Sequence, residues 1–203
     1  MYKPDTIQIS TAMLTRERYS NVAEHNKHRS ELFGKAVWLS LRKKNYLYKM
    51  TTDQTKIKNI FLSDDDADDC SFFEEALKEV SSETELTITR DGVELMTTLH
   101  ETVTEPPPPD VIFLDLNMPR KNGFECLKEI RETLKWKNIP VVIFSTSANV
   151  DTIERAYSLG ANCYIRKPSS HQLLKKAIET VLALDFWEQS ERLPKEKFVL
   201  AIS

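Results

Sequence analysis

The 203-residue sequence has few of the residues that build cross-linked or glycine-rich sites. Its three cysteines, at positions 70, 126 and 163, are scattered and lack CxxC spacing, which argues against a disulfide framework or a zinc site and fits a reducing cytoplasm. Only four glycines are present, and no glycine-rich loop follows the first predicted strand, so a P-loop or ordinary dinucleotide site is not expected. No apolar run approaches the ~20 residues that span a bilayer, and no signal-peptide pattern opens the chain. We therefore expect a cytoplasmic chain without a membrane span.

Positive charge is unevenly distributed along the chain. Residues 1–55 contain ten lysines and arginines against five acidic residues, whereas the remainder contains 18 against 26. The first segment is otherwise polar, with one hydrophobic patch at residues 32–41 followed by a basic run at 42–44. This composition predicts a basic, poorly ordered extension. The alternatives are an amphipathic helix and a basic run that binds nucleic acid or an anionic membrane, and Met50 is a candidate for the biological start.

From residue 59 onward, strand-like and helix-like segments alternate. Short apolar runs bounded by turn signals predict strands at 59–63, 86–89, 111–114, 141–144 and 162–165. Apolar residues at helical spacing predict helices at 67–80, 93–101, 124–133, 150–159 and 172–184. Four prolines at positions 106 to 109 form a stiff surface connection. The alternation predicts an α/β fold with a doubly wound, mostly parallel sheet and helices on both of its faces.

Acidic residues follow two of the predicted strands, at the edge where ligands bind in such sheets. Asp115 comes directly after the third strand, and Asp64 and Asp65 come directly after the first. Taken alone, Asp115 is a candidate metal ligand, phosphoacceptor or helix cap. The first and third strands are expected to be neighbours, so the three carboxylates would crowd together, repel one another and attract Mg²⁺. The remaining acidic residues of this segment are explained as caps of the following helix: Asp66, Asp68 and Asp69.

The fourth and fifth strands bring a hydroxyl group and an ammonium group to the same edge. Ser145 follows the fourth strand, and Lys167 follows the fifth. A serine hydroxyl donates to phosphate oxygens, and a lysine pairs with a carboxylate or a phosphoryl oxygen. Each residue alone has an ordinary explanation as a turn residue or a solvated charge. Their arrival at one edge with the carboxylates indicates a site that handles a phosphoryl group.

These residues resemble, in type, order and spacing, the receiver domain of two-component response regulators. The matching set is Asp64-Asp65, Asp115-Leu116-Asn117-Met118-Pro119 with Gly123, then Ser145, and then Lys167-Pro168. The resemblance implies a flavodoxin-like, five-stranded parallel sheet in the order 2-1-3-4-5. It also implies a receiver domain at residues 56–187 and a C-terminal tail at 188–203 without a recognisable output domain.

The resemblance also implies a role for each residue. Asp115 is the phosphoacceptor, assisted by Lys167, and Ser145 and Tyr164 are the switch residues, with Tyr164 swinging inward on phosphorylation. The implied Mg²⁺ site consists of the side chains of Asp64, Asp65 and Asp115 and the backbone carbonyl of Asn117. Two departures are mild: Ser63 occupies a position that is usually apolar, and serine stands at 145 where threonine is commoner. The implied protein is a signalling protein whose only chemistry is phosphotransfer and autodephosphorylation.

The implied donor is a histidine kinase or a histidine phosphotransfer protein. An unidentified downstream protein would bind the face formed by the fourth helix, the fifth strand and the last helix of the domain. A homodimer through the fourth helix and the fifth strand is a further possibility. Three alternatives compete with this interpretation. An aspartyl-phosphate phosphatase is disfavoured because Asn117 stands where a second aspartate is needed. A DNA-binding regulator using the basic extension lacks a clear helix-turn-helix, so nucleic acid is not expected as a partner. The last alternative is a receiver-like interaction domain that is never phosphorylated.

Overall fold

The computed structural model describes residues 59–102, 109–184, 186 and 193–202, which all belong to a compact unit running from Thr55 to Ser203. The predictions for residues 1–55, for a start at Met50 and for most of the proline segment lie outside the described residues. Among the described residues, no helix has the length and apolar character needed to cross a membrane.

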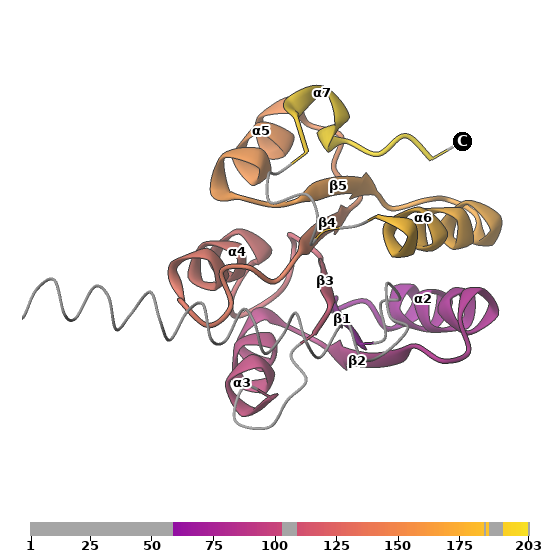
Figure 1. The fold of residues 1–203 in the computed structure, drawn as a ribbon, viewed down its shortest axis with the longest axis horizontal. Coiled ribbons are helices and arrows are strands. Elements are labelled where there is room, and N and C mark those ends of the chain that lie inside the picture. Colours follow the sequence, from indigo (N-terminus) through magenta and orange to yellow (C-terminus); the bar gives the residue numbers. More distant parts are fainter. Residues whose placement is uncertain (1–58, 103–108, 185, 187–192, 203) are drawn as a thin grey trace, which may run out of the picture. The chain divides into compact units, whose positions relative to one another are not determined.

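The centre of the structure is a parallel sheet of five strands (Figure 1). Its strands are β1 (Asn59–Ser63), β2 (Glu85–Thr89), β3 (Val111–Leu114), β4 (Val141–Ser145) and β5 (Cys163–Arg166). They are arranged in the order β2-β1-β3-β4-β5, which confirms the predicted topology. The three central strands consist almost entirely of buried Val, Ile, Leu and Phe residues, the composition expected where helices cover both faces of a sheet.

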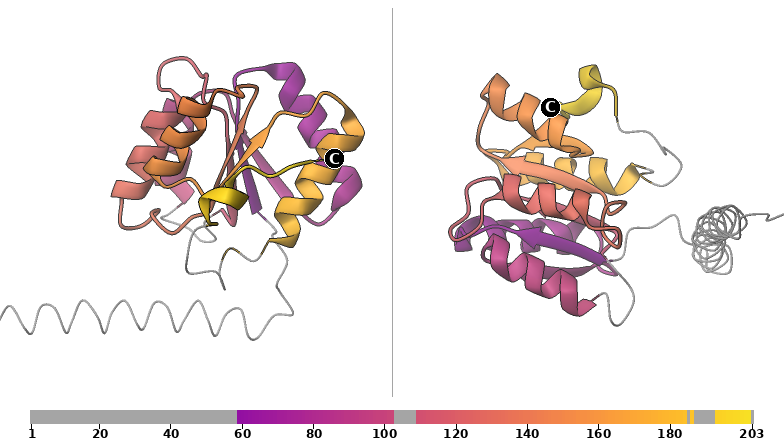
Figure 2. Two further views of the ribbon diagram at one scale, coloured as in Figure 1. Left: turned by 90° about the horizontal axis from the view of Figure 1, so that it is seen from above. Right: turned by 90° about the vertical axis from the view of Figure 1, so that its left-hand side faces the viewer.

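Helices cover both faces of this sheet, as the sequence predicted (Figure 2). They are α2 (Ala67–Val80), α3 (Gly92–Thr102), α4 (Gly123–Glu132), α5 (Val150–Leu159), α6 (His171–Ala183) and α7 (Lys195–Phe198). Helices α2 and α6 contribute to one hydrophobic cluster, which includes Phe73 and Ile178. Helices α3, α4 and α5 contribute to a second cluster on the opposite face, which includes Leu95, Leu127 and Ala156. The sheet therefore has two separate cores, and its carboxyl edge lies between them.

Local signals explain where the helices begin and end. Asp66 is the N-cap of α2, because its side chain accepts hydrogen bonds from the backbone N–H groups of Asp68 and Asp69. Asn122 and Glu125 form a capping box at the start of α4. Gly160 ends α5 in the left-handed conformation, with φ of 97°. With such signals present, none of the ten predicted strands and helices differs from the structure by more than one residue at either end.

Helix α7 was not foreseen in the sequence, which predicted only a tail after residue 187. It has four residues, too few to show helical periodicity, and its Phe198 side chain is buried against the core. The described part of this tail is therefore packed onto the domain.

Candidate functional site

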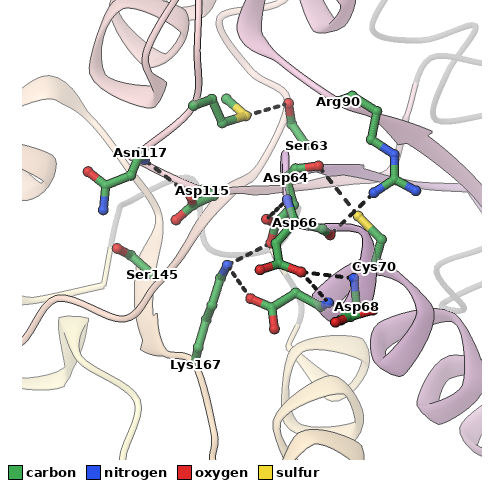
Figure 3. A network of polar contacts seen from close by, with 12 residues as sticks. Ser63, Asp64, Asp66, Asp68, Cys70, Arg90, Asp115, Asn117, Ser145 and Lys167 are labelled. Atoms are coloured by element: carbon green, nitrogen blue, oxygen red, sulfur yellow. Dashed lines mark hydrogen bonds and ion pairs between the residues drawn. The ribbon is translucent and has the colours of Figure 1, made fainter.

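Three carboxylates meet at the carboxyl edge of the sheet. Strands β1 and β3 pair in parallel with Ser63 opposite Leu114, so the next residue of each strand, Asp64 and Asp115, lies at the same edge (Figure 3). One oxygen from each of Asp64, Asp65 and Asp115 lies within 4.8 Å of the others. Asp64 and Asp115 are buried, whereas Asp65 is exposed. The predicted acidic cluster is thus present in the fold.

Burial makes the charged forms of the two inner carboxyl groups unfavourable. It raises the pKa of both Asp64 and Asp115 above the usual carboxyl range, although Lys167 acts in the opposite direction. Backbone N–H groups also donate to both carboxylates, from Asp66 N to Asp64 Oδ1 and from Asn117 N to Asp115 Oδ2, each at 3.2 Å. These contacts stabilise negative charge without cancelling the cost of burial. A divalent cation would supply the missing compensation.

The donor set fits a hard cation. Carboxylate oxygens are the ligands that Mg²⁺ prefers in proteins, and Mg²⁺ is usually held by few carboxylates together with water. Asp64, Asp65 and Asp115 supply such oxygens from two neighbouring strands. The N–H of Asn117 donates to Asp115, which places the Asn117 backbone beside the cluster. These four residues are those that the sequence assigned to the metal.

Lys167 lies at the same edge and pairs with two carboxylates. Its Nζ is 2.8 Å from Asp64 Oδ2 and 2.7 Å from Asp69 Oδ2. Burial alone would lower the pKa of Lys167, but the hydrogen bonds that its ammonium group donates to Asp64 and Asp69 outweigh burial and raise it. The ammonium group therefore stays protonated. The backbone N–H of Lys167 donates to the carbonyl oxygen of Ser145 at 2.9 Å, which extends the pairing of β4 with β5 to the site.

Asp69 is a member of the site that sequence reasoning missed. It was explained there as a capping residue only, yet its side chain is one of the two partners of Lys167. A signal was present in the sequence, since Asp69 lies in the first turn of α2, only a few residues after the strand end that carries Asp64 and Asp65. The contact with Lys167, 98 residues away, depends on the tertiary fold.

The two predicted switch residues are both buried at the end of β4 and in β5. The Ser145 hydroxyl accepts a hydrogen bond from Ser147 N at 3.4 Å, and Figure 3 shows its side chain near Asp115 and Lys167. The Tyr164 hydroxyl donates to the carbonyl oxygen of Ser147 at 2.9 Å. Tyr164 is fully buried, so the structure already has it in the inward position that the resemblance associates with phosphorylation.

The loop between β3 and α4 is fixed by close contacts. Gly123 N donates to Leu116 O at 3.1 Å, and a Cβ atom at Gly123 would overlap the carbonyl oxygen of Asp115. Arg120 has a positive φ of 62°, and its guanidinium group forms an ion pair with Asp91. Asp91 is itself buried at the start of α3. The ion pair connects the loop that carries Asn117 to the turn after β2, and no sequence motif indicated it.

A chain of hydrogen bonds explains the unusual serine at position 63. Thr89 Oγ1 donates to Ser63 Oγ at 3.0 Å, and Ser63 Oγ donates to the sulfur of Met118 at 3.2 Å. Both hydroxyl groups are buried. These hydrogen bonds link β2 and β1 to Met118, the residue that follows Asn117.

We predict that Ser63→Ala lowers the free energy of unfolding by about 1 kcal/mol, because it removes two buried hydrogen bonds. Urea unfolding followed by circular dichroism measures this change. Ser158→Ala is the matched control, since the Ser158 hydroxyl is exposed and bonds only within its own helix. Equal stability of the Ser63→Ala variant and the natural chain would contradict the structural role of this hydroxyl chain.

Comparison with known proteins agrees with this geometry. The family model described as the response regulator receiver domain matches residues 60–179. The response regulator Rcp1 of Synechocystis sp. is 35% identical over 147 residues, which cover 71% of this chain and 99% of Rcp1. The chemotaxis protein CheY1 of Helicobacter pylori is 36% identical over 72 residues, covering 36% of this chain and 58% of CheY1.

Solved structures of similar sequence share the fold. The phosphorylated cyanobacterial phytochrome response regulator RcpA has 38% identity and a TM-score of 0.58, covering 68% of this chain and 99% of RcpA. The Mn²⁺-bound form of Rcp1 has 37% identity and a TM-score of 0.56, again covering 68% of this chain and 99% of Rcp1. With the matching strand order, acidic cluster and lysine, these similarities show that the chain belongs to the response regulator receiver domain family.

Proposed function

We propose that this chain is a phosphorylation-controlled receiver in which Asp115 accepts a phosphoryl group from a histidine kinase or a histidine phosphotransfer protein. Receiver domains are signalling modules of two-component systems and are not classical enzymes. The observation that carries the proposal is the meeting of Asp64, Asp65 and Asp115 with Lys167 at the carboxyl edge of the sheet. A buried carboxylate that lies near both a lysine ammonium group and two further carboxylates is suited to metal-assisted phosphoryl transfer.

Each residue has a distinct part in this reaction. The Asp115 carboxylate attacks the phosphorus atom of the donor's phosphohistidine, the P–N bond breaks as the histidine imidazole leaves, and the carboxylate becomes an acyl phosphate. Bound Mg²⁺ would be held by Asp64, Asp65 and Asp115 and would neutralise negative charge on the phosphoryl oxygens. Lys167 provides a second positive charge, and the Ser145 hydroxyl donates a hydrogen bond to a phosphoryl oxygen. Asn117 and Ser147 flank the phosphoryl group and influence how fast water removes it.

The phosphoryl group changes the surface by adding charge to the site. An acyl phosphate adds about −1.5 to −2 charges, which draws the Ser145 hydroxyl toward the new oxygens. Tyr164 contacts the same loop, because its hydroxyl donates to Ser147 O. The face formed by α5, β5 and α6 carries the resulting change to a downstream protein.

We propose that the donor is a kinase of the phytochrome class. RcpA is described as a phytochrome response regulator, and it matches this chain along 99% of its own length. CheY1 matches this chain along 58% of its own length. Phosphotransfer from a phytochrome kinase, compared with transfer from a chemotaxis kinase at equal concentrations, tests this assignment. Faster transfer from the chemotaxis kinase would overturn it without affecting the role of Asp115.

Acetyl phosphate tests the proposed phosphoryl transfer in the absence of any kinase. The full chain is incubated with radiolabelled acetyl phosphate and Mg²⁺, and the labelled residue is located by mass spectrometry after reduction with borohydride. We expect a base-labile label at Asp115 that requires Mg²⁺. A label on a different residue, or none at all with the folded chain, would overturn the proposal.

Mg²⁺ binding is expected to stabilise the fold. At ten times its dissociation constant, a ligand that binds only the folded state raises the free energy of unfolding by about 1.4 kcal/mol. We predict this gain for the natural chain and its loss in Asp65→Asn, which removes an exposed ligand of the cluster. Thermal unfolding with and without Mg²⁺ measures both. Asp68→Asn, in the first turn of α2 and outside the cluster, is the control that should keep the gain.

A further inference from the structure

The outer edge of β5 is covered by residues 194–200, which we call the C-terminal segment. Val199 forms a parallel bridge with Tyr164, and Leu200 N donates to Tyr164 O at 2.9 Å. Figure 1 shows α7 beside α5 and the following residues running along β5. A sheet edge exposes backbone hydrogen-bonding groups, and proteins commonly cover such an edge. The segment therefore occupies the position of a sixth strand, but it forms only one β-bridge with β5.

An aromatic side chain anchors the C-terminal segment. Phe198 is 1% exposed and belongs to the core cluster between the sheet and helices α3, α4 and α5. Its ring centroid is 5.0 Å from that of Tyr157 on α5, in an edge-to-face arrangement, and 6.3 Å from that of Tyr164. A buried aromatic in contact with other rings contributes both hydrophobic burial and favourable ring geometry. Phe198 is therefore the main contact of the segment with the domain.

An ion pair and a backbone hydrogen bond flank this anchor. Lys195 Nζ lies 2.7 Å from Glu154 Oε1 on α5. Leu200 supplies the hydrogen bond to β5 and packs against the cluster on the opposite face of the sheet. The side chain of Val199, between these contacts, is 43% exposed. The domain thus contacts a cation, an aromatic ring three residues later, and an apolar residue two positions beyond the ring.

These contacts lie within six consecutive residues, so a separate peptide contains all of them. Short peptides commonly bind by adding a strand to a sheet edge, with side-chain pockets setting specificity. We propose that the surface formed by Glu154, Tyr157 and Tyr164 is a peptide-docking site that the C-terminal segment occupies within the chain. A downstream protein engages it with a segment of the same chemistry, a lysine followed by an aromatic residue and then an apolar residue, and displaces the chain's own.

This site lies on the face that the proposed function uses for output, and the inference rests on that function only for its place in signalling. Docking itself transfers no group, so it is measured without a phosphodonor. Failure of docking and failure of Asp115 labelling are therefore distinguishable results.

A labelled peptide of residues 193–203 tests the site by fluorescence anisotropy. We expect full-length Phe198→Ala to bind this peptide at least about tenfold more tightly than the natural chain does, because truncating a buried phenylalanine weakens the internal competitor. Full-length Val199→Ala is the matched control and should bind like the natural chain, since that side chain is partly exposed. A peptide carrying Phe198→Ala should not bind either chain.

Charge exchange identifies where the peptide binds. In the Phe198→Ala chain, Glu154→Lys should weaken peptide binding roughly two- to fivefold, the range for an exposed ion pair, and a peptide carrying Lys195→Glu should restore binding.

Equal binding by the natural and Phe198→Ala chains, or no binding to a folded Phe198→Ala chain, would overturn the proposal. If circular dichroism shows Phe198→Ala to be unfolded, full-length Lys195→Glu replaces it. That variant should bind the natural peptide roughly two- to fivefold more tightly than the natural chain does, and equal binding would overturn the proposal.

Discussion

Asp115→Asn is expected to reduce labelling by acetyl phosphate by at least about a hundredfold, because removal of a nucleophile eliminates the covalent route. Asparagine has nearly the same size and keeps an oxygen that accepts the hydrogen bond from Asn117 N. Its amide is not a nucleophile at neutral pH. The variant therefore removes the chemistry and preserves the shape of the site. Incorporation of label per mole of chain measures the effect.

The same variant should be at least as stable as the natural chain. Burial raises the pKa of Asp115, so the folded state holds a proton on this group at pH values where the unfolded state has lost it. The free energy of unfolding consequently falls as the pH rises from the ordinary carboxyl pKa through the raised one. Asp115→Asn lacks the contribution of Asp115 to this fall and keeps that of Asp64, whose pKa is also raised. We expect the variant to be about 1 kcal/mol more stable at pH 7 in the absence of metal, as is common when a functional site is neutralised.

Two controls make the result decisive. Asp68→Asn changes an acidic residue in the first turn of α2, outside the cluster, and should keep full labelling. Urea unfolding at several pH values shows whether the Asp115→Asn variant is folded. Undiminished labelling of that variant would refute Asp115 as the phosphoacceptor. A stability that falls with pH as steeply as in the natural chain would refute the electrostatic account.

Gly123→Ala is expected to lower the free energy of unfolding by about 3 kcal/mol, the upper end of the usual cost of overpacking. The added Cβ would overlap the carbonyl oxygen of Asp115, and the Cα of Leu116 would lie only 2.9 Å away. Both neighbours are backbone atoms, so no side-chain rotation relieves the overlap. The sign of the change is informative, because glycine to alanine within a helix ordinarily adds up to ~1 kcal/mol of stability.

The displaced backbone also belongs to Asp115, the proposed phosphoacceptor. Gly123→Ala should therefore slow labelling of Asp115 in molecules that remain folded, as measured at a temperature well below the unfolding transition. Lys128→Ala, on the exposed side of the same helix, controls for helix propensity and should retain natural stability and labelling. Stabilisation of the chain by Gly123→Ala would show that the loop adjusts without cost.

Much of the fold was predictable because its signals are local. Apolar runs such as 111–114 can be read as buried strands, and the residue after each strand is placed at a known edge once the strands are parallel. The sequence therefore identified Asp64, Asp115 and Lys167 correctly as neighbours at one edge. The pairing of Lys167 with Asp69 was missed because it depends on where α2 starts relative to β5.

Other features were not predictable because tertiary contacts alone produce them. The ion pair between Arg120 and Asp91 depends on an arginine with positive φ, which no local rule favours. Helix α7 is too short for periodicity to reveal, and Phe198 is buried only because Tyr157 and Tyr164 lie opposite it. In each case the residues can be read from the sequence, but their proximity arises only from the tertiary fold.

The strand order has a consequence for how the site comes into existence. Strand β1 pairs with β3, not only with β2, so contacts such as that between Ser63 and Met118 join residues 55 positions apart. Long-range pairing of this kind closes large loops and forms late in folding. A nascent chain folded only as far as β2 contains Asp64 and Asp65 but has no partner strand to bring Asp115 beside them. The proposed phosphoacceptor site is therefore assembled only when β3 pairs with β1 and the central sheet closes.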